Sequence, residues 1–263
     1  MKRCLTIAGS DSGGGAGVQA DLKTFGALGV FGMSAITAVT AQNTVRVARI
    51  QEMDPEMVAS QIDAVAEDIG VDAAKTGMLW SAEIVGAVCD AALRNRIPTL
   101  VVDPVTVAKS GATLLREDAL SALRSRLLPM AQLVTPNVPE AEILAGGTIT
   151  DARAMRDAAR RIHALGPRCV VIKGGHLEGP EAVDVAFDGR SFELFREARV
   201  RTRNTHGAGC TFSAAATAYL ALGYPPFEAI ARAKRFVTGA IRSAPALGRG
   251  AGPLHHFHAL DRD

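Results

Sequence analysis

The sequence predicts a three-layer α/β/α fold in which a mostly parallel central sheet carries helices on both faces. Short apolar runs of strand length alternate with longer amphipathic runs along the chain, which is typical of βαβ units. The strand candidates are nearly continuous apolar runs, as expected for a parallel sheet covered on both faces. No linker, repeat or low-complexity tract breaks this pattern, so we expect residues 1–263 to form a single domain.

The expected elements follow one another in a regular order. Short apolar runs predict strands at Cys4–Ala8, Met33–Ala41, Asp72–Thr76, Thr99–Asp103, Leu133–Thr135 and Cys169–Lys173. Amphipathic runs predict helices at Val18–Leu28, Pro55–Ile69, Ala82–Asn95, Asp118–Leu127, Pro139–Leu144 and Asp151–Leu165. An Asp-Gly step predicts an antiparallel hairpin with strands at Val183–Phe187 and Phe192–Phe195. Two further helices are expected at about Cys210–Leu222 and Pro226–Ala240.

Composition and charge exclude several classes of protein. The net charge is +2 and only 5% of the residues are aromatic, so the chain lacks the basic face and interleaved aromatics of a nucleic-acid-binding protein. No apolar run approaches the roughly 18 residues of a membrane-spanning helix, and the run after Lys2-Arg3 is too short for a signal peptide. We therefore expect a cytoplasmic protein that binds neither nucleic acid nor membrane.

The segments that follow the predicted strands are the expected place for chemistry. In sheets of this type, ligands bind beyond the carboxyl ends of the strands. Small, polar or turn-forming residues stand at these places and indicate one shared crevice: Gly9-Ser10-Asp11, Gln42-Asn43-Thr44, Gly77-Met78, Pro104-Val105, Pro136-Asn137 and Gly174-Gly175.

A glycine-rich segment, Gly9–Gly17, lies between the first strand and the first helix. Glycines let a backbone turn sharply and approach a ligand. We therefore favour a loop that closes over a small substrate, with Asp21 one helical turn further on the same side. A dinucleotide-binding loop is disfavoured because no acid ends the second strand, and a P-loop because the Gly-Lys-Ser/Thr ending is missing. A plain turn without a ligand stays open.

A second glycine-rich turn, Gly207-Ala208-Gly209-Cys210, begins a helix of small residues. Backbone N–H groups exposed at a helix start form an anion site together with the helix dipole. Such a site can stabilise the charge on a phosphoryl group during its transfer. A simple turn at the start of a helix is the alternative.

Acidic and lysine side chains complete the predicted crevice. Asp103 and Glu140 each follow an apolar strand, and two carboxylates at this edge can hold Mg²⁺ directly or through water. Taken alone, Glu140 could equally be an ordinary acid in the first turn of a helix. Lys173 ends a buried strand, from which a cation can reach the phosphates of ATP, whereas a buried lysine without a partner would be unfavourable.

Seven collinear segments between residue 4 and about residue 258 form one ordered set. They are Ala8–Asp21, Thr37–Thr44, Lys75–Met78, Asp103–Val105, Thr135–Glu142, Lys173–His176 and Gly207–Cys210. The set resembles the ribokinase-like superfamily, and within it the hydroxymethylpyrimidine kinase branch. Each segment alone is a weak to moderate signal, but the ordered set is specific. The resemblance implies a ribokinase-like fold and a homodimer.

The resemblance also implies an activity. ATP would phosphorylate the hydroxymethyl group of 4-amino-5-hydroxymethyl-2-methylpyrimidine and then convert the monophosphate to the diphosphate, in thiamine biosynthesis. By position, Gln42 would hydrogen-bond the pyrimidine, because an amide offers both a donor and an acceptor. The implied ring contacts are Gly9, Thr40, Met78 and Val105, with Asp21 closing the substrate side. The implied nucleotide contacts are Asn137, Lys173, Lys234 and the Gly207–Gly209 turn for ATP, and Asp103 and Glu140 for Mg²⁺.

Cys210 departs from the wider superfamily, in which an aspartate at this position acts as catalytic base. The hydroxymethylpyrimidine branch shares the cysteine, so Cys210 is the expected base, and the helix N-terminus is expected to lower the pKa of its thiol. The second phosphorylation needs little base, since a phosphate monoester is already largely anionic. A pyridoxal kinase of the same superfamily is the alternative, and a catalytically silent nucleotide-binding protein is a further one.

Overall fold

The computed structural model of the chain describes residues 1–106, 114 and 116–260 and confirms the predicted α/β class. Within these residues the sheet has nine strands: β1 (Arg3–Asp11), β2 (Phe31–Gln42), β3 (Val47–Glu52), β4 (Ala73–Thr76), β5 (Leu100–Val102), β6 (Leu133–Val134), β7 (Val170–Ile172), β8 (Glu181–Phe187) and β9 (Phe192–Ala198). The α-helices of the same part are α1 (Gly17–Ala27), α2 (Pro55–Asp68), α3 (Ala82–Arg94), α4 (Glu117–Ala122), α5 (Val138–Ala145), α6 (Ala152–His163), α7 (Ala208–Ala221) and α8 (Pro226–Arg242). No helix in this part of the chain is long and apolar enough to cross a bilayer.

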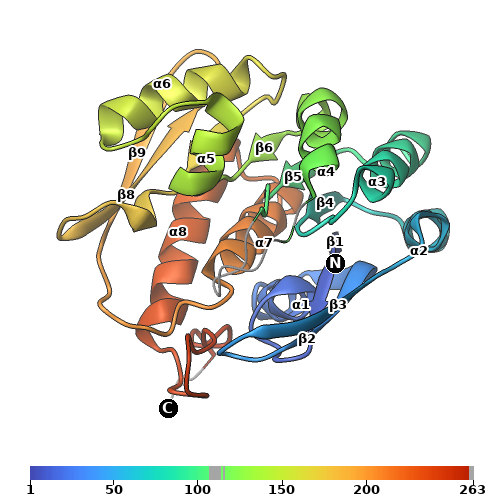
Figure 1. The fold of residues 1–263 in the computed structure, drawn as a ribbon, viewed down its shortest axis with the longest axis horizontal. Helices are drawn as coiled ribbons and strands as arrows, with labels where there is room; N and C mark the ends of the chain where they lie inside the picture. The colour runs from blue at the N-terminus through green and yellow to red at the C-terminus, as the bar shows by residue number, and fades with distance from the viewer. Residues whose placement is uncertain (107–113, 115, 261–263) are drawn as a thin grey trace.

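The strands form one mixed sheet in the order β3-β2-β1-β4-β5-β6-β7-β8-β9 (Figure 1). The strands from β2 to β7 in this order pair in parallel, whereas β3, β8 and β9 add antiparallel pairs at the two edges. Parallel strands place their carboxyl ends on one edge of a sheet. The segments that follow β1, β2, β4, β5, β6 and β7 therefore meet there, as the sequence predicts.

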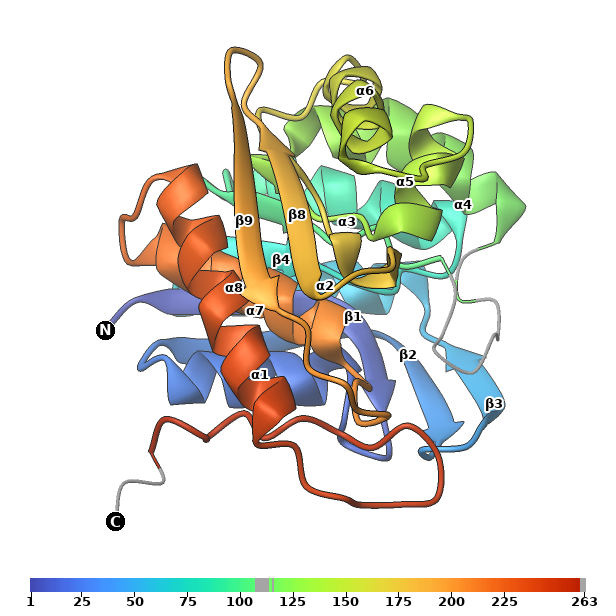
Figure 2. The same ribbon diagram turned by 90° about the vertical axis from the view of Figure 1, so that its left-hand side faces the viewer.

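Helices cover both faces of the sheet. Helices α1, α7 and α8 pack on one face and α2 to α6 on the other (Figures 1 and 2). Alternate residues of one strand enter different cores: Leu5 and Ile7 of β1 pack with the α2–α6 layer, whereas Cys4 packs with Phe25 and Ala214 of α1 and α7. This alternation follows from the two-residue period of a strand. It explains why the central strands are apolar along their whole length.

Helix α7 lies against the middle of the sheet, next to β1, β4 and β5. Its buried residues are mostly small, with Ala214, Ala215 and Ala218 among them. Side chains of this size let a helix pack close to the strands without leaving voids. The start of α7 is therefore held near the carboxyl ends of the central strands.

Several boundaries differ from the prediction. Strands β1 and β2 continue through Asp11 and Gln42, beyond the expected ends. The edge strand β3 is missing from the prediction because its residues are half-exposed or exposed and form no long apolar run. Pairing with β2 makes this segment a strand, and that pairing exists only in the folded chain. The expected helix Asp118–Leu127 is α4 followed by a wider helical turn through Leu127.

Candidate active site

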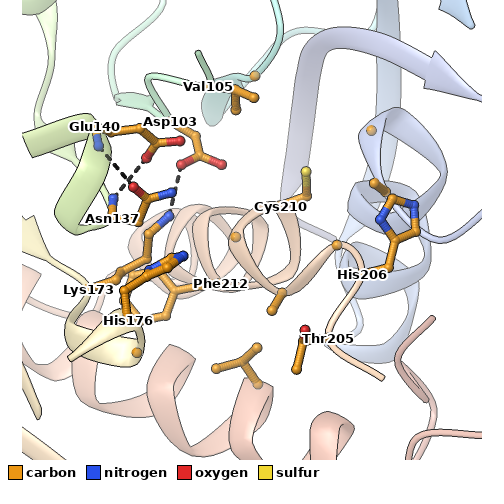
Figure 3. Close-up of a pocket in the computed structure, with 18 of the residues that line it drawn as sticks. Asp103, Val105, Asn137, Glu140, Lys173, His176, Thr205, His206, Cys210 and Phe212 are labelled. Carbon is orange, nitrogen blue, oxygen red and sulfur yellow. Dashed lines mark hydrogen bonds and ion pairs between the residues drawn. The ribbon is translucent and has the colours of Figure 1, made fainter. Parts of the chain in front are cut away.

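A cavity of about 770 Å³ opens at the carboxyl edge of the sheet, beside the start of α7 (Figure 3). Nearly all of the predicted site residues line it: Gly9, Thr40, Gln42, Met78, Asp103, Val105, Asn137, Glu140, Lys173, Gly207, Ala208, Gly209, Cys210 and Lys234. Asp21 is the exception among the predicted residues. The chain therefore brings segments from its whole length to one place.

The cavity has two ends of different character. The end that we name the β2 end is lined by Gly9, Thr40, Gln42, Met78 and Val105. The opposite end, named the α8 end, is lined by Asn137, Lys173, Lys234, Val237 and Ile241. The Gly207–Cys210 turn lies at the junction of the two ends, since it approaches Lys173 at Gly209 and the first glycine-rich loop at Gly207. Figure 3 shows Cys210 and Lys173 in the cavity wall. A small polar ring could occupy the first end and a larger anionic molecule the second.

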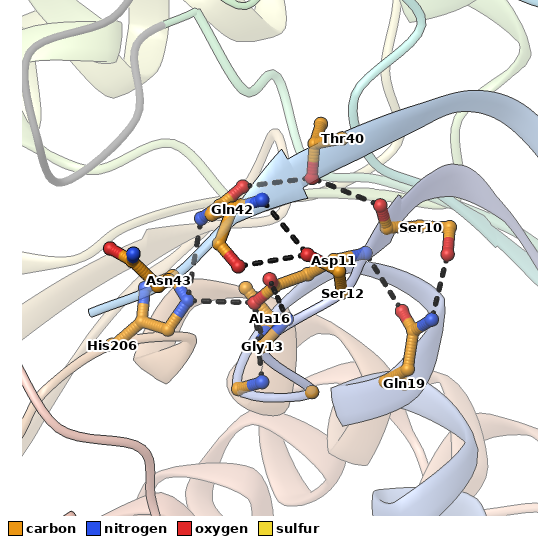
Figure 4. Close-up of polar contacts among 12 residues, drawn as sticks. Ser10, Asp11, Ser12, Gly13, Ala16, Gln19, Thr40, Gln42, Asn43 and His206 are labelled. Atoms are coloured by element: carbon orange, nitrogen blue, oxygen red, sulfur yellow. Dashed lines mark hydrogen bonds and ion pairs between the residues drawn. The ribbon is translucent and has the colours of Figure 1, made fainter. Parts of the chain in front are cut away.

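Gln42 lies at the β2 end, where neighbouring groups hold its carboxamide. Its Oε1 lies 3.1 Å from Oγ1 of Thr40, and the same hydroxyl lies 3.0 Å from the carbonyl oxygen of Ser10. Its Nε2 lies 3.5 Å from Nε2 of His206 (Figure 4). Nε2 of His206 carries the hydrogen that it donates to Asp11, so it cannot accept a hydrogen bond from Gln42. The contact with Thr40 therefore sets the orientation of this amide.

The carboxylate of Asp11 joins the two glycine-rich turns. It accepts hydrogen bonds from the backbone N–H groups of Gly13 at 2.8 Å, Gly15 at 3.2 Å and Ala16 at 2.9 Å, and from Nε2 of His206 at 2.8 Å (Figure 4). Burial raises the pKa of Asp11, but these hydrogen bonds outweigh burial and hold it below its ordinary value. The sequence placed Asp11 in a segment expected to border the crevice, but it assigned no role to Asp11 or to His206. The available signal is the Asp-Ser-Gly-Gly pattern, in which a side chain accepts from the N–H groups that follow it.

Asp103 and Lys173 form an ion pair near the junction, with Nζ and Oδ1 3.1 Å apart. The same carboxylate accepts from Thr135 at 3.1 Å and from Ser213 at 3.2 Å. Burial raises the pKa of Asp103, but Lys173 and Lys75 outweigh it, so the pKa lies below its ordinary value. Burial lowers the pKa of Lys173, but Asp103 and Glu140 together outweigh burial, so the pKa lies above its ordinary value. Both groups are therefore charged at neutral pH.

Asn137 and Glu140 cap the start of α5 with reciprocal hydrogen bonds. Oδ1 of Asn137 accepts from the N–H of Glu140 at 2.9 Å, and Oε2 of Glu140 accepts from the N–H of Asn137 at 2.8 Å. Burial raises the pKa of Glu140 to about 7, with Asp103 adding to the rise and Lys173 opposing it. A carboxylate that is buried and short of positive charge would be stabilised by a cation.

The carboxylates of Asp103 and Glu140 fit a Mg²⁺ ion that takes its other ligands from water and phosphate. Within the described ranges, no group of three or more His, Cys, Asp and Glu side chains could hold a metal ion. Mg²⁺ is usually bound by one or two carboxylates together with substrate phosphates. The donor set therefore suits an ion that arrives with a nucleotide better than an ion bound by protein alone.

At the α8 end, Lys234 forms a second buried ion pair, with its Nζ 2.8 Å from Oδ2 of Asp184. Oδ1 of Asp184 accepts from the N–H of Gly174 at 2.9 Å. The pair connects α8 to β8 and to the turn after Lys173. Lys234 lines the cavity, but it shares its charge with Asp184, a lining residue that sequence reasoning missed.

The Gly207–Cys210 turn places the start of α7 beside Lys173. Gly207 has φ +81°, and a Cβ at this position would lie 1.9 Å from the carbonyl oxygen of Gly15, so only glycine fits. A Cβ on Gly209 would lie 3.4 Å from Nζ of Lys173. The positive end of the helix dipole and a lysine therefore act on the same space, which favours an anion.

Cys210 lies at the junction, but its thiol is not acidic in this structure. Burial raises the pKa of Cys210 to about 12. Lys75 and a hydrogen bond from the N–H of Gly17 oppose this rise, whereas Asp21 and Asp103 add to it. The expectation of a lowered pKa is therefore wrong here, because desolvation and two carboxylates outweigh the favourable groups.

Asp21 lies behind the cavity wall. Its side chain and that of Lys75 are both 0% exposed, and Nζ of Lys75 lies 3.0 Å from Oδ2 of Asp21. Thr6 donates to the same oxygen at 2.6 Å. The prediction that Asp21 borders the substrate is corrected accordingly, because its side of α1 faces the sheet.

Comparison with known proteins agrees with this geometry. The sequence model of the phosphomethylpyrimidine kinase family matches residues 11–255, which is most of the chain. The chain belongs to this family. One member, the thiamine biosynthesis bifunctional protein ThiED of Geobacter sulfurreducens, is 55% identical over 257 residues. That match covers 98% of the chain and 52% of ThiED, so the chain spans about half the length of this relative.

Another member of the family matches the chain over nearly its whole length. The hydroxymethylpyrimidine/phosphomethylpyrimidine kinase of Rhizobium meliloti is 50% identical over 262 residues, with 98% of each protein covered. Among solved structures, an ADP complex of Bacillus subtilis pyridoxal kinase has a TM-score of 0.93 and 41% identity, with 100% of both chains covered. These matches confirm the predicted ribokinase-like fold and show that the chain is a kinase.

Proposed function

We propose that this family member uses ATP to phosphorylate 4-amino-5-hydroxymethyl-2-methylpyrimidine and then its monophosphate, giving the diphosphate for thiamine biosynthesis. The observation that carries the proposal is a single cavity with an amide at one end, lysines at the other and a helix start between them. The Rhizobium meliloti relative is named for this activity and matches nearly the whole chain, which supports the same substrate.

The β2 end suits a small ring that bears an amino group. The amide of Gln42 offers the donor and the acceptor that a ring nitrogen and a neighbouring amino group require. Met78 and Val105 provide apolar contacts for the ring. A Cβ on Gly9 would lie 3.0 Å from the sulfur of Met78, so glycine at this position keeps room for the ring.

The junction and the α8 end suit phosphoryl transfer from ATP. The charge of a phosphoryl group in transfer spreads over its oxygens, and catalysis consists mainly of positioning and electrostatic stabilisation. The N–H groups of the Gly207–Cys210 turn and Nζ of Lys173 supply positive potential for this purpose. Asn137 and Lys234 would contact the rest of ATP at the α8 end.

Two further roles belong to the proposal. Asp103 and Glu140 would hold Mg²⁺, which neutralises phosphate charge when it is bound. Cys210 would accept the proton of the hydroxymethyl group in the first step, and its thiol must therefore be ionised beforehand. The second step needs no such base, because a phosphate monoester is largely anionic near neutral pH.

A pyridoxal kinase is the second candidate, favoured by the structural likeness to the Bacillus subtilis enzyme. The test is a panel of acceptors with ATP and Mg²⁺: hydroxymethylpyrimidine, its monophosphate, pyridoxal, pyridoxine and ribose. We expect the highest kcat/KM with the first two and little ATP turnover without an acceptor. A higher kcat/KM with pyridoxal would favour the second candidate. Turnover that no acceptor stimulates would point to a silent nucleotide-binding protein.

The homodimer that the family resemblance implies and the cytoplasmic location expected from the sequence belong to the same proposal. Light scattering on the purified protein tests the first. A homodimer has twice the 27.5 kDa mass of the chain, and a mass of one chain would contradict it. Fractionation of cells that produce the protein tests the second.

A further inference from the structure

A fully buried ion pair behind the cavity has no part in the proposed reaction. Nζ of Lys75, in β4, lies 3.0 and 3.1 Å from the two carboxylate oxygens of Asp21, in α1. Neither side chain is exposed, and Thr6 of β1 donates to Asp21. Burying two charges carries a large desolvation penalty, so such a pair is weak support for stability by itself. Its position next to the junction suggests another role.

The pair lies close to Cys210. Helix α7, which carries Cys210, packs on α1 and β4, the elements that carry Asp21 and Lys75. A Cβ on the cavity-lining Gly77 would lie 3.4 Å from Nζ of Lys75, so this ammonium group is just behind the wall. Gly17 begins α1, Cys210 lies in the first turn of α7, and both residues line the cavity. Two helices therefore begin at the cavity wall.

Charged groups from four segments act on this sulfur atom. They are Lys75 of β4, Asp21 of α1, Asp103 after β5 and Lys173 after β7. Lys75 favours the thiolate of Cys210, and the two carboxylates oppose it. Because Asp21 is in contact with Lys75, the effect of the pair on the thiol is the difference between two opposing influences.

We propose that the Lys75–Asp21 pair sets the reactivity of the Cys210 thiol. Lys75 is the cation that stabilises the thiolate, and Asp21 holds Lys75 in place and limits its effect. The inference rests on the proposed function, in which the thiolate takes the hydroxyl proton while the alcohol oxygen bonds to the γ-phosphorus and the bond to ADP breaks. The resulting thiol then returns its proton to solvent. Lys75 and Asp21 are positioning residues, because neither lines the cavity.

Alkylation of Cys210 tests the inference without using kinase activity. Cys4, Cys89 and Cys169 are buried, so Cys210 is the thiol within the described residues that a reagent can reach. The probe is iodoacetamide at about pH 8, with the modified fraction followed by mass spectrometry. When the thiol pKa rises by one unit, less of the cysteine is thiolate, but that thiolate is a stronger nucleophile. The two effects together slow the reaction about threefold.

The two single variants are expected to change the rate in opposite directions. Lys75→Met removes the cation, and we expect alkylation to slow about threefold or more. Asp21→Asn leaves Lys75 with no contacting carboxylate, and we expect alkylation to become faster by a similar factor. The double variant should react faster than Lys75→Met, since it also lacks the carboxylate of Asp21, which opposes the thiolate. Thr6→Val is the matched control, because it removes a hydrogen bond to Asp21 but no charge.

Opposite changes in the two single variants, with Thr6→Val near the parent rate, would support the inference. If the substitutions only loosened the core, Cys210 would become more exposed and alkylation would be faster in every variant. If both single variants reacted at the parent rate, the ion pair would not act on the thiol. Either result would overturn the inference. If Lys75→Met does not fold, Asp21→Asn against Thr6→Val decides the question alone. Alkylation needs no substrate, so failure of the proposed kinase reaction would be recognised separately.

Discussion

Asp11 and His206, 195 residues apart in the sequence, meet in a hydrogen bond of 2.8 Å that joins the two glycine-rich turns of the cavity. A carboxylate only accepts hydrogen bonds, so Nε2 of His206 carries the hydrogen. Gly15 and Gly207 are packed against each other in the same two turns, so closely that a side chain on Gly207 would overlap the Gly15 carbonyl. The loop at the β2 end and the turn at the start of α7 therefore hold each other in place.

We expect His206→Leu to lower kcat/KM for the pyrimidine by about tenfold to a hundredfold, with ATP affinity near the parent value. The variant removes one hydrogen bond to a charged group, which contributes about 1.5–3 kcal/mol. His206→Gln keeps a donor at the end of the side chain and should recover most of the activity. Steady-state kinetics on both substrates check this, and parental kcat/KM in His206→Leu would show that the bond does not position the loop.

Gln42→Leu should weaken use of hydroxymethylpyrimidine and leave the KM for ATP nearly unchanged. Each polar group of the pyrimidine ring that loses its partner should weaken transition-state binding by about 1–3 kcal/mol, or roughly tenfold to a hundredfold in kcat/KM. Gln61→Leu is a matched control, because that amide bonds to the backbone of Ile36 on the same strand but does not line the cavity. Equal kcat/KM in Gln42→Leu and the parent would remove Gln42 from the substrate site.

Asp103→Asn and Glu140→Gln should each raise the Mg²⁺ concentration needed for half-maximal rate. Each substitution deletes a negative charge where we place the ion. Glu142→Gln, on the same helix, is the control, since this side chain accepts from the N–H of Ile149 and does not line the cavity. If both cavity variants titrate with Mg²⁺ like the parent, these acids are structural and the ion binds elsewhere.

Cys210→Ala should slow the first phosphorylation by about 10²–10⁴-fold, the usual contribution of a general base. The second phosphorylation should suffer much less, because its nucleophile is already anionic and the backbone donors of the turn survive the substitution. Cys210→Asp should keep measurable activity in the first step. Single-turnover kinetics on the alcohol and on the monophosphate check this. Equal slowing of both steps would mean that the thiol shapes the anion site and takes no proton.

Acid should destabilise the protein over a pH range that is set partly by the pKa of His256. Burial lowers the pKa of His256 to about 4 in the folded chain, against about 6.5 when unfolded. Between these values the unfolded state binds more protons, so the free energy of unfolding falls as the pH drops, by up to about 1.4 kcal/mol per pH unit. Urea unfolding at several pH values should show a shallower slope in His256→Gln. Parallel slopes in the two proteins would contradict this.

Much of the fold could be predicted because its signals are local. The alternation of apolar and amphipathic runs predicts the central strands and the helices, and the Asp-Gly step at Asp188 predicts the β8–β9 hairpin that the structure contains. Strand β3 could not be predicted in this way, since an edge strand with exposed residues has no continuous apolar run. Its pairing partner, β2, identifies it only after folding.

By itself the sequence determined which residues follow each strand, and therefore that Gln42, Asp103 and Lys173 reach one cavity. The ends of strands and the glycine turns depend on residues adjacent in the chain, and these can be read directly from the sequence. Only the tertiary structure decided that Asp21 pairs with Lys75 behind the wall, and that the pKa of the Cys210 thiol is raised. Burial and charge partners come from packing between segments far apart in the chain, so no local pattern contains them.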